Sequence, residues 1–305
     1  MSKDIRIKKG LDIKLVGVAQ KELDNAAASS FYYVRPEDFH SIIPKLVARE
    51  GTHVKAGETL FYNKSVESMK FVSPVSGEIV EVQRGPKRRI DAFKIKADVN
   101  QDYVNHGAFN LSGKKAEEIK NHLLASGCWS FVKQRPYDVV ANPALTPKAI
   151  FISGHASAPL AADLNFALSG KEKELQAAIT ALGMLTDGKV HVGVAKNSDS
   201  IFTGLSGIEL HKVSGPHPSG NVGTLINKID PINKGETVYT VAAQDLVIIG
   251  ELLLTGKFNA ERVVALAGSS VENPRYFTTK IGATLDTFIY KNGIEKGANH
   301  TVISS

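Results

Sequence analysis

Residues 51–96 constrain the fold of this chain more than any other stretch, because their pattern suits only short β-strands. Apolar and β-branched residues occur there in brief runs. Glycine and proline separate the runs, at Gly57, at Ser76-Gly77 and at Gly85-Pro86. Such runs between turn residues are typical of strands in a compact all-β domain. Together with similar residues upstream they predict an all-β domain over residues 1–100, with these strands: Phe31–Val34, Thr59–Tyr62, Lys70–Val72, Glu78–Val82 and Ala92–Ile95.

This stretch resembles the small β-sandwich of biotin and lipoyl carrier proteins, and Glu67-Ser68-Met69-Lys70 is similar to the biotin-acceptor motif. The resemblance implies an acceptor lysine at the tip of a β-hairpin. Lys70, however, lies thirteen residues after Gly57 and only four before Pro74. Because a strand advances about 3.3 Å per residue, Lys70 is expected well down the returning strand. We therefore expect a scaffold sandwich without biotinylation at Lys70, and a carrier protein is the alternative.

Residues 101–255 alternate between helical and strand patterns. Amphipathic spacing predicts helices from about Lys114, over Leu160–Leu168 and over Glu172–Leu185. Apolar runs predict strands at Ala149–Ser153, Lys189–Ala195 and Ile208–Val213. Alternation of this kind indicates a parallel sheet with crossover helices, and hence an α/β domain. Residues 256–305 return to a β-like pattern that stops within an apparent strand, so we expect a truncated third module there.

Composition excludes several kinds of protein. The one cysteine, Cys128, cannot supply the roughly four thiolates of an iron–sulfur cluster. There is no secretory signal at the N-terminus and no run of about 20 apolar residues that would span a membrane, so a cytosolic location is expected. The net charge of +6 includes the cluster Lys87-Arg88-Arg89. No nucleic-acid motif accompanies it, which leaves a solvated turn or a docking site for an acidic protein or an anionic membrane.

The loop from Ser214 to Gly223 is the first candidate site. It contains three glycines and two prolines, and glycine allows a ligand to approach the main chain closely. His217 adds a group that can carry a proton near neutral pH. A ligand loop containing His217, Gly220 and Asn221 and a rigid structural turn both fit this composition.

The second candidate is Ser153-Gly154-His155, at the carboxyl end of a predicted parallel strand, where open α/β sheets bind ligands. His155 also fits a plain hydrogen-bonded turn residue. The chain contains neither G-x-G-x-x-G nor a Walker A pattern, and its histidines and cysteine lack metal-binding spacing. No metal site is therefore expected.

Taken together, the segments resemble one family along nearly the whole chain: the A subunit of the bacterial sodium-translocating NADH:quinone oxidoreductase, related to the flavin-bearing NADH subunit of complex I and to the Rnf C subunit. The matching pieces are Ile7–Asp12, Val54–Gly57, Phe71–Gly77, Arg84-Gly85, Arg135-Pro136, Ser214–Gly223, Ile229–Pro231, Gln244-Asp245 and Ile249-Gly250.

The resemblance implies an α+β multidomain chain. Its parts would be a biotinyl/lipoyl-like β-sandwich, or barrel-sandwich hybrid, over 1–100, a Rossmann-like α/β domain over 101–255 and the start of a β-grasp (SLBB-like) module over 256–305. It also implies a peripheral subunit on the cytoplasmic side of the inner membrane that takes part in binding ubiquinone or menaquinone. The chain itself would hold no tightly bound cofactor. NADH, flavins and iron–sulfur centres would belong to the other subunits.

A quinone needs an apolar slot and one or two hydrogen-bond donors at its carbonyl oxygens, and its reduction to quinol takes up two protons. The candidates are His217, Gly220 and Asn221, with Gly154 and His155 nearby and with Arg135 and Tyr137 along the approach. No residue is assigned a catalytic role. The competing interpretations are a subunit of an Rnf-type electron-transport complex, a biotin or lipoyl carrier, and an assembly subunit of the sodium pump that does not bind quinone.

Overall fold

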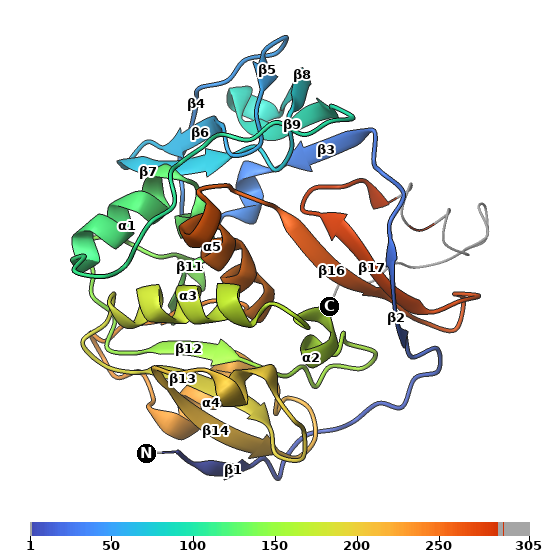
Figure 1. Ribbon diagram of the computed structural model, residues 1–305, viewed down its shortest axis with the longest axis vertical. Helices are drawn as coiled ribbons and strands as arrows, with labels where there is room; N and C mark the ends of the chain where they lie inside the picture. Colours follow the sequence, from blue (N-terminus) through green and yellow to red (C-terminus); the bar gives the residue numbers. More distant parts are fainter. Residues whose placement is uncertain (1, 286–288, 290–305) are drawn as a thin grey trace.

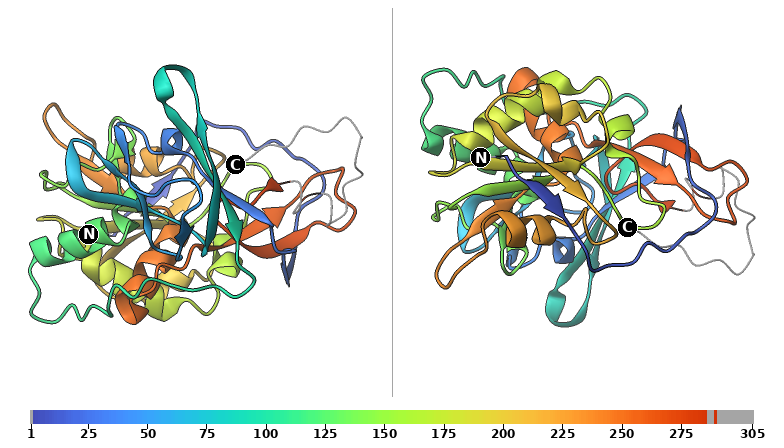
Figure 2. Two further views of the ribbon diagram at one scale, coloured as in Figure 1. Left: turned by 90° about the horizontal axis from the view of Figure 1, so that it is seen from above. Right: turned by 90° about the horizontal axis from the view of Figure 1, so that it is seen from below.

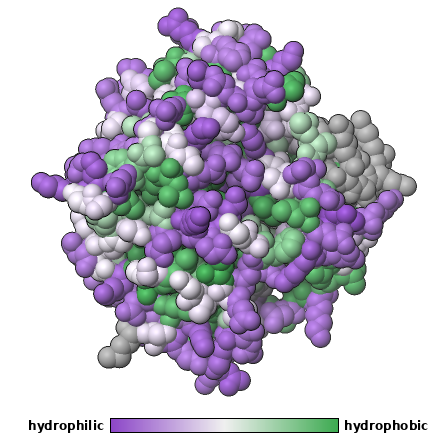
Figure 3. Space-filling model, in the orientation of Figure 1, coloured by the Kyte–Doolittle hydropathy of each residue, from purple (hydrophilic) through white to green (hydrophobic). Residues whose placement is uncertain are grey.

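The computed structural model describes residues 2–285 and Ile289, which form four sheets. Figure 1 shows the β domain at the top, the α/β domain below it and a small third sheet beside both. On the face seen in Figure 3, polar side chains predominate and apolar ones gather in separate patches.

The β domain consists of two facing sheets. One has the order β3-β9-β8-β5 and the other β4-β6-β7. Its core contains a stack of buried aromatic rings, in which the centroids of Phe61 and Phe71 are 4.7 Å apart and those of Phe61 and Phe93 5.6 Å. The strands are β3 (Phe31–Val34), β4 (Pro44–Leu46), β5 (His53–Val54), β6 (Thr59–Asn63), β7 (Val66–Val72), β8 (Gly77–Arg84) and β9 (Ile90–Ala97). The long β8–β9 hairpin projects from the body of the molecule (Figure 2).

The α/β domain is built on a seven-stranded sheet of order β1-β14-β13-β12-β15-β10-β11. The first five strands in this order are parallel; at the other edge β10 runs antiparallel to both of its neighbours, β15 and β11. The strands are β1 (Asp4–Arg6), β10 (Lys133–Arg135), β11 (Val139–Val140), β12 (Ile150–Ser153), β13 (Val190–Ala195), β14 (Ile208–Ser214) and β15 (Val238–Thr240). The three predicted apolar strands are confirmed as β12, β13 and β14. Their runs are continuous because both faces of a parallel sheet are covered.

Helices cover both faces of this sheet. Ile150 and Ile152 pack in one core with α3 (Glu172–Gly183) and α5 (Ala243–Thr255), while Phe151 packs on the opposite face with α4 (Val222–Ile229). α3 and α5 cross so closely that a Cβ on Gly250 would lie 1.9 Å from the carbonyl oxygen of Glu174. α1 (Ala116–Ala125) packs against β7 and a 3₁₀ turn, Cys128–Phe131.

The helix expected over Leu160–Leu168 is shorter than the sequence pattern indicates. α2 spans Leu164–Ala167. It begins there because the Asp163 carboxylate accepts hydrogen bonds from the backbone amides of Asn165 and Phe166, at 2.9 and 3.3 Å. An aspartate that satisfies the free amides of the first turn fixes the start of a helix.

The third sheet has the order β16-β17-β2. β16 (Glu261–Leu266) and β17 (Arg275–Lys280) are antiparallel, and β2 (Gln20–Asn25) pairs in parallel with β17. The first two strands of the chain thus belong to sheets other than the β domain in which the sequence analysis placed them. The expected strand residues between 286 and 305 lie outside the described residues, apart from Ile289.

Candidate functional site

The two sequence candidates meet at the carboxyl edge of the α/β sheet. Ser153 ends β12 and Ser214 ends β14, and the loops that follow are joined by hydrogen bonds. The Ser153 hydroxyl donates to the carbonyl oxygen of Gly220 at 2.6 Å. The Ser157 hydroxyl accepts from the Gly220 amide at 2.8 Å and lies 3.0 Å from Nδ1 of His217. The predicted position of Gly154 and His155 at a strand's carboxyl end is therefore correct.

The polar groups at this edge are largely engaged in hydrogen bonds within the protein, some of them with the segment that follows β1. The His217 amide donates to the Asp12 carboxylate at 2.8 Å, and the His217 carbonyl oxygen accepts from the Leu11 amide at 3.0 Å. Gly220 is required sterically, because a Cβ there would lie 2.6 Å from the amide nitrogen of Ser157. Asn221 precedes the first residue of α4, and its side chain makes no capping bond. Hydrogen bonds to the segment after β1 and to the loop after β12 thus hold the glycine loop in one conformation.

His155 differs from its neighbours at this edge in having a ring nitrogen without a hydrogen-bond partner in the described part of the chain. Its Nδ1 atom is buried and has no hydrogen-bond partner among the described residues. Burial lowers the pKa of His155, and a contact with the backbone of Gly193 opposes that shift. His155 is therefore neutral near pH 7. Beside it, Gly154 leaves little free space, because a Cβ there would lie 2.9 Å from the Phe202 ring.

Arg135 and Tyr137 lie elsewhere. Arg135 ends the antiparallel strand β10 opposite Val238, which begins β15, so it is at the amino edge of the parallel strands. Its guanidinium is 3.3 Å from the Asp138 carboxylate, and the Tyr137 side chain is 79% exposed. The structure therefore does not place these two residues beside the glycine loop.

Lys70 lies within β7, where it pairs with Tyr62 of β6. The β6–β7 turn is at Lys64 and Ser65, so Lys70 is not at the hairpin tip, as its position in the sequence predicted. The basic cluster Lys87-Arg88-Arg89 is exposed at the tip of the β8–β9 hairpin.

A cavity lies at the β15 side of β12. β12 is flanked by β13 on one side and by β15 on the other, and open α/β sheets bind ligands at such a point of reversal. The loop after β12 and the first turn of α5 after β15 contribute to a cavity of about 800 Å³ between the three parts of the molecule. Its lining includes Tyr33, Arg35, Asp38, Phe39, Phe71, Phe131, Leu160, Ala162, Gln244, Asp245, Phe258, Arg262, Val264, Thr279, Lys280, Gly282 and Leu285.

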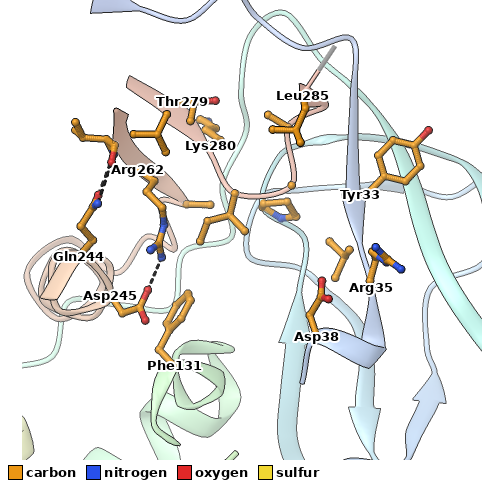
Figure 4. A pocket seen from close by; sticks show the side chains of 18 of the residues that line it. Tyr33, Arg35, Asp38, Phe131, Gln244, Asp245, Arg262, Thr279, Lys280 and Leu285 are labelled. Atoms are coloured by element: carbon orange, nitrogen blue, oxygen red, sulfur yellow. Dashed lines mark hydrogen bonds and ion pairs between the residues drawn. The ribbon is translucent and has the colours of Figure 1, made fainter. Parts of the chain in front are cut away.

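The polar wall of the cavity joins α5 to β16. The Arg262 guanidinium donates to the Asp245 carboxylate, and the two face each other in Figure 4. Gln244 makes two bonds of 2.9 Å to the backbone of Val263, one to its carbonyl oxygen and one from its amide. Gln244 thus continues the hydrogen bonding of edge strand β16, while Asp245 fixes the Arg262 side chain.

Burial shifts the pKa values of two ionisable groups at or near this wall. It raises the pKa of Asp245, and the nearby Arg262 acts in the opposite direction. Burial also lowers the pKa of Lys133, which does not line the cavity but interacts electrostatically with Asp245; its ammonium lies 5.7 Å from the centroid of the Phe39 ring. Across the opening, Arg35 and Asp38 come from the β domain (Figure 4). The cavity therefore combines an aromatic and aliphatic lining with a few ionisable groups, which is the usual character of a small-molecule site.

None of the residues predicted for the site lines this cavity. Its walls come from segments far apart in the chain, and no local motif marks them. The one available signal was Gln244-Asp245, a polar pair directly before the apolar run Leu246–Leu254. This signal was weak, because an aspartate in the first turn of a helix is common.

Other kinds of site find less support among the described residues. They contain no group of three or more histidine, cysteine or acidic side chains that could hold a metal ion. Nor do they include a helix long and apolar enough to cross a membrane.

Fold and cavity define a class: a multidomain protein in which a barrel-sandwich β domain and a doubly wound α/β domain enclose a ligand-sized hollow. Three family models match in order: "NqrA N-terminal barrel-sandwich hybrid domain" at residues 5–98, "NqrA second alpha/beta domain" at 114–258 and "NQRA C-terminal domain" at 263–304. The chain belongs to the NqrA family, whose curated members are named as the A subunit of the Na(+)-translocating NADH-quinone reductase.

Three curated relatives of that name show how far the match extends. The chain is 32% identical over 305 residues to the protein from Serratia proteamaculans, covering 99% of this chain and 68% of the relative. It is 32% identical to the Pseudomonas aeruginosa (PAO1) protein over 303 residues, covering 99% and 67%. With the Neisseria meningitidis serogroup B protein it shares 34% over 284 residues, covering 92% and 63%.

Proposed function

We propose that this chain is the A-type subunit of a sodium-translocating NADH–quinone reductase and that it binds ubiquinone or menaquinone in the cavity between its three parts. Membership of the family across three consecutive modules supports the first half. In this proposal NADH, flavins and iron–sulfur centres are held by the other subunits, and the chain is peripheral on the cytoplasmic side of the inner membrane. The kinship with Rnf C and complex I, and the lipoyl-like, Rossmann-like and β-grasp identities of the modules, belong to the same proposal.

The observation that carries the quinone site is the composition of the cavity. A quinone has a flat apolar ring, an apolar tail and two carbonyl oxygens that accept hydrogen bonds. Phe39, Phe71, Phe131 and Leu160 offer an apolar lining, and about 800 Å³ is within the range that ligand pockets occupy. Arg262 provides donors, because a guanidinium has five N–H groups and Asp245 occupies only part of that set.

Asp245 gives the site a proton-handling group. Reduction to quinol adds two electrons and two protons, and the electrons would come from redox groups on the other subunits. Burial raises the pKa of Asp245, which brings proton uptake by this carboxyl closer to neutral pH. When protonated, this carboxyl can supply one of the two protons to a quinone oxygen and the second is taken up from solvent, while the guanidinium stabilises the developing negative charge on oxygen.

The edge at His217 is less suited to the quinone ring, because its amides and hydroxyls are engaged within the protein. The candidate residues His217, Gly220, Asn221, Gly154 and His155 remain a prediction for this second position. The same holds for Arg135 and Tyr137, which lie apart from it. The variant His217→Ala distinguishes the two possible quinone sites. A site in the cavity predicts unchanged quinone affinity, whereas a site at His217 predicts weaker binding.

The test is a titration of the chain with ubiquinone-1, followed by the fluorescence of Trp129, which is the single tryptophan and immediately precedes the lining residues Ser130 and Phe131. Arg262→Gln should weaken binding by about 10- to 100-fold, the effect of losing a charge-assisted hydrogen bond. Ala162→Trp should also weaken binding, because the added indole ring protrudes into the cavity from its lining.

The matched control is Arg275→Gln. Arg275 pairs with Glu22 and Asp24 on the third sheet and does not line the cavity. Equal affinity for the Arg262, Ala162 and Arg275 variants would exclude the cavity as the quinone site. Absence of any ubiquinone-1 binding by the unaltered chain would reject quinone binding as a property of this polypeptide by itself.

A further inference from the structure

An exposed apolar segment connects β1 to β2. Leu11, Ile13, Leu15, Val16 and Val18 have side chains between 52% and 71% exposed. Single exposed apolar residues are ordinary, but a contiguous group of this kind usually marks an interaction surface. We call residues 11–18 the N-terminal connector. In Figures 1 and 2 it runs as a dark blue trace outside the sheets.

Between its two ends, the connector has a backbone that is unpaired within residues 2–285, just as its apolar side chains are largely exposed. The amides of residues 12–16 have no backbone partner among the described residues. Leu11, Ile13 and Leu15 alternate with Asp12 and Lys14, which is the period of a β-strand. The segment therefore has the pattern of a strand without a neighbour in the part of the chain that the structure describes.

Both ends of the connector are fixed. At one end the Leu11 amide donates to the carbonyl oxygen of His217 at 3.0 Å. At the other, the Gly268 amide donates to the carbonyl oxygen of Gly17 at 2.9 Å. Gly17 has a φ of +88°, and a Cβ there would lie 2.3 Å from the Gly268 carbonyl carbon. A segment held at both ends loses less conformational entropy on binding than a free tail.

The charge near the connector is positive. Lys8, Lys9 and Lys14 are exposed, whereas the carboxylate of Asp12 already accepts the His217 amide. A complementary surface therefore combines apolar side chains with acidic ones.

A lipid bilayer and a polypeptide both offer apolar contacts, but they differ in what they do for the backbone. Hydrocarbon cannot hydrogen-bond the free amides and carbonyls of residues 12–16, so burying them in lipid is unfavourable. A second strand satisfies these groups and packs on the alternating apolar side chains at the same time. The unpaired backbone thus favours a polypeptide partner.

We propose that the N-terminal connector is a docking strand, which pairs with an extended, apolar and acid-flanked segment of another subunit of the reductase. This inference rests on the proposed function, because it takes the partner from the same complex.

The experiment compares the free chain with the chain co-expressed with the other subunits and purified as the assembled complex. Hydrogen exchange at the amides of residues 12–16 should slow by about tenfold or more on assembly. In parallel, Ile13→Cys is labelled with a benzophenone maleimide and irradiated in the complex. Labelling is selective because Cys128 is fully buried. The crosslinked peptide should come from one of the other subunits, with the predicted apolar and acidic composition.

Two variants separate side-chain from backbone contributions. Ile13 is 56% exposed in the free chain, so docking would newly bury about half of its side chain. Ile13→Ser removes this contribution and should weaken assembly by about tenfold. Lys14→Pro removes one backbone donor that is unpaired in the free chain, and it should weaken assembly to a similar extent. Val99→Ser is the control, because Val99 is 98% exposed and outside the connector, and it should have no effect.

Each contrary result has a distinct meaning. Assembly with unchanged exchange at residues 12–16 overturns the docking strand and leaves the proposed function intact. Crosslinks only to phospholipid identify a membrane contact, and crosslinks to a second copy of this chain identify self-association; both overturn the inference. Failure of the chain to associate with the other subunits rejects the proposed function together with the docking strand.

Discussion

The buried histidine pair on β13 and β14 should make the stability of the α/β domain depend on pH. His211 is fully buried, and its Nε2 lies 3.0 Å from Nδ1 of His191. Its Nδ1 accepts the backbone amide of Lys3 at 3.1 Å. His211 therefore carries its proton on Nε2 and donates it to His191. A second proton on Nδ1 would place two donors opposite each other.

The magnitude follows from the pKa. Burial, and secondarily the charge of His191, lowers the pKa of His211 from 6.5 to about 4. The unfolded chain then binds more protons than the folded chain between these two values. Stability should be complete above about pH 6.5 and fall as the pH decreases toward 4. At about 1.36 kcal/mol per pH unit, the loss between pH 7 and pH 5 is at most about 2 kcal/mol.

Urea denaturation at pH 7 and pH 5, followed by Trp129 fluorescence, measures this loss. His211→Asn removes the titrating group and should reduce the difference in stability between the two pH values by up to about 2 kcal/mol. His40→Asn, at an exposed histidine, should leave the difference unchanged. If the His211 variant and the unaltered chain lose equal stability between pH 7 and pH 5, the histidine pair is not the cause.

Three further results are expected. Burial raises the pKa of the Cys128 thiol, so Cys128 should react with a thiol reagent such as dithiobisnitrobenzoate only after unfolding; rapid reaction of the native chain would contradict its burial. Gly250→Ala should lower the free energy of unfolding by about 1–3 kcal/mol, because the added methyl group meets the Glu174 carbonyl oxygen where α3 and α5 cross; an unchanged urea midpoint would show that the crossing is loose. The intact mass of the chain should equal that of the unmodified polypeptide, since Lys70 lies within β7; an added biotinyl or lipoyl mass would favour the carrier interpretation.

Local sequence patterns predicted the strands that are buried on both faces. β12, β13 and β14 were found because a parallel strand covered on both faces is a continuous apolar run. The helix α4 was not predicted at all, because its first turn falls in Gly220-Asn221-Val222-Gly223, which has the composition of a loop. β1 gave no signal at all. Only three residues long, it pairs with a strand some two hundred positions later. Pairing over such distances is a property of the whole fold and not of the local sequence.

The site was predictable only in part, for the same reason. Ser153-Gly154-His155 could be placed at a strand's carboxyl end, because a strand followed by a glycine turn is a local pattern. The cavity could not be found in this way. Arg262 and Asp245 are seventeen residues apart and meet only because β16 packs beside the first turn of α5. Phe71 and Phe131 likewise come from different domains.

The placement of β1, β2 and β3 determines how this protein can be divided. These three successive strands are edge strands of three different sheets. The first 34 residues therefore connect the three sheets. No single cleavage of the chain separates one module without removing a strand from another. A fragment beginning at residue 101 would leave both the α/β sheet and the third sheet with an open edge. Biochemical dissection of the protein will require supplying the N-terminal residues as a separate peptide.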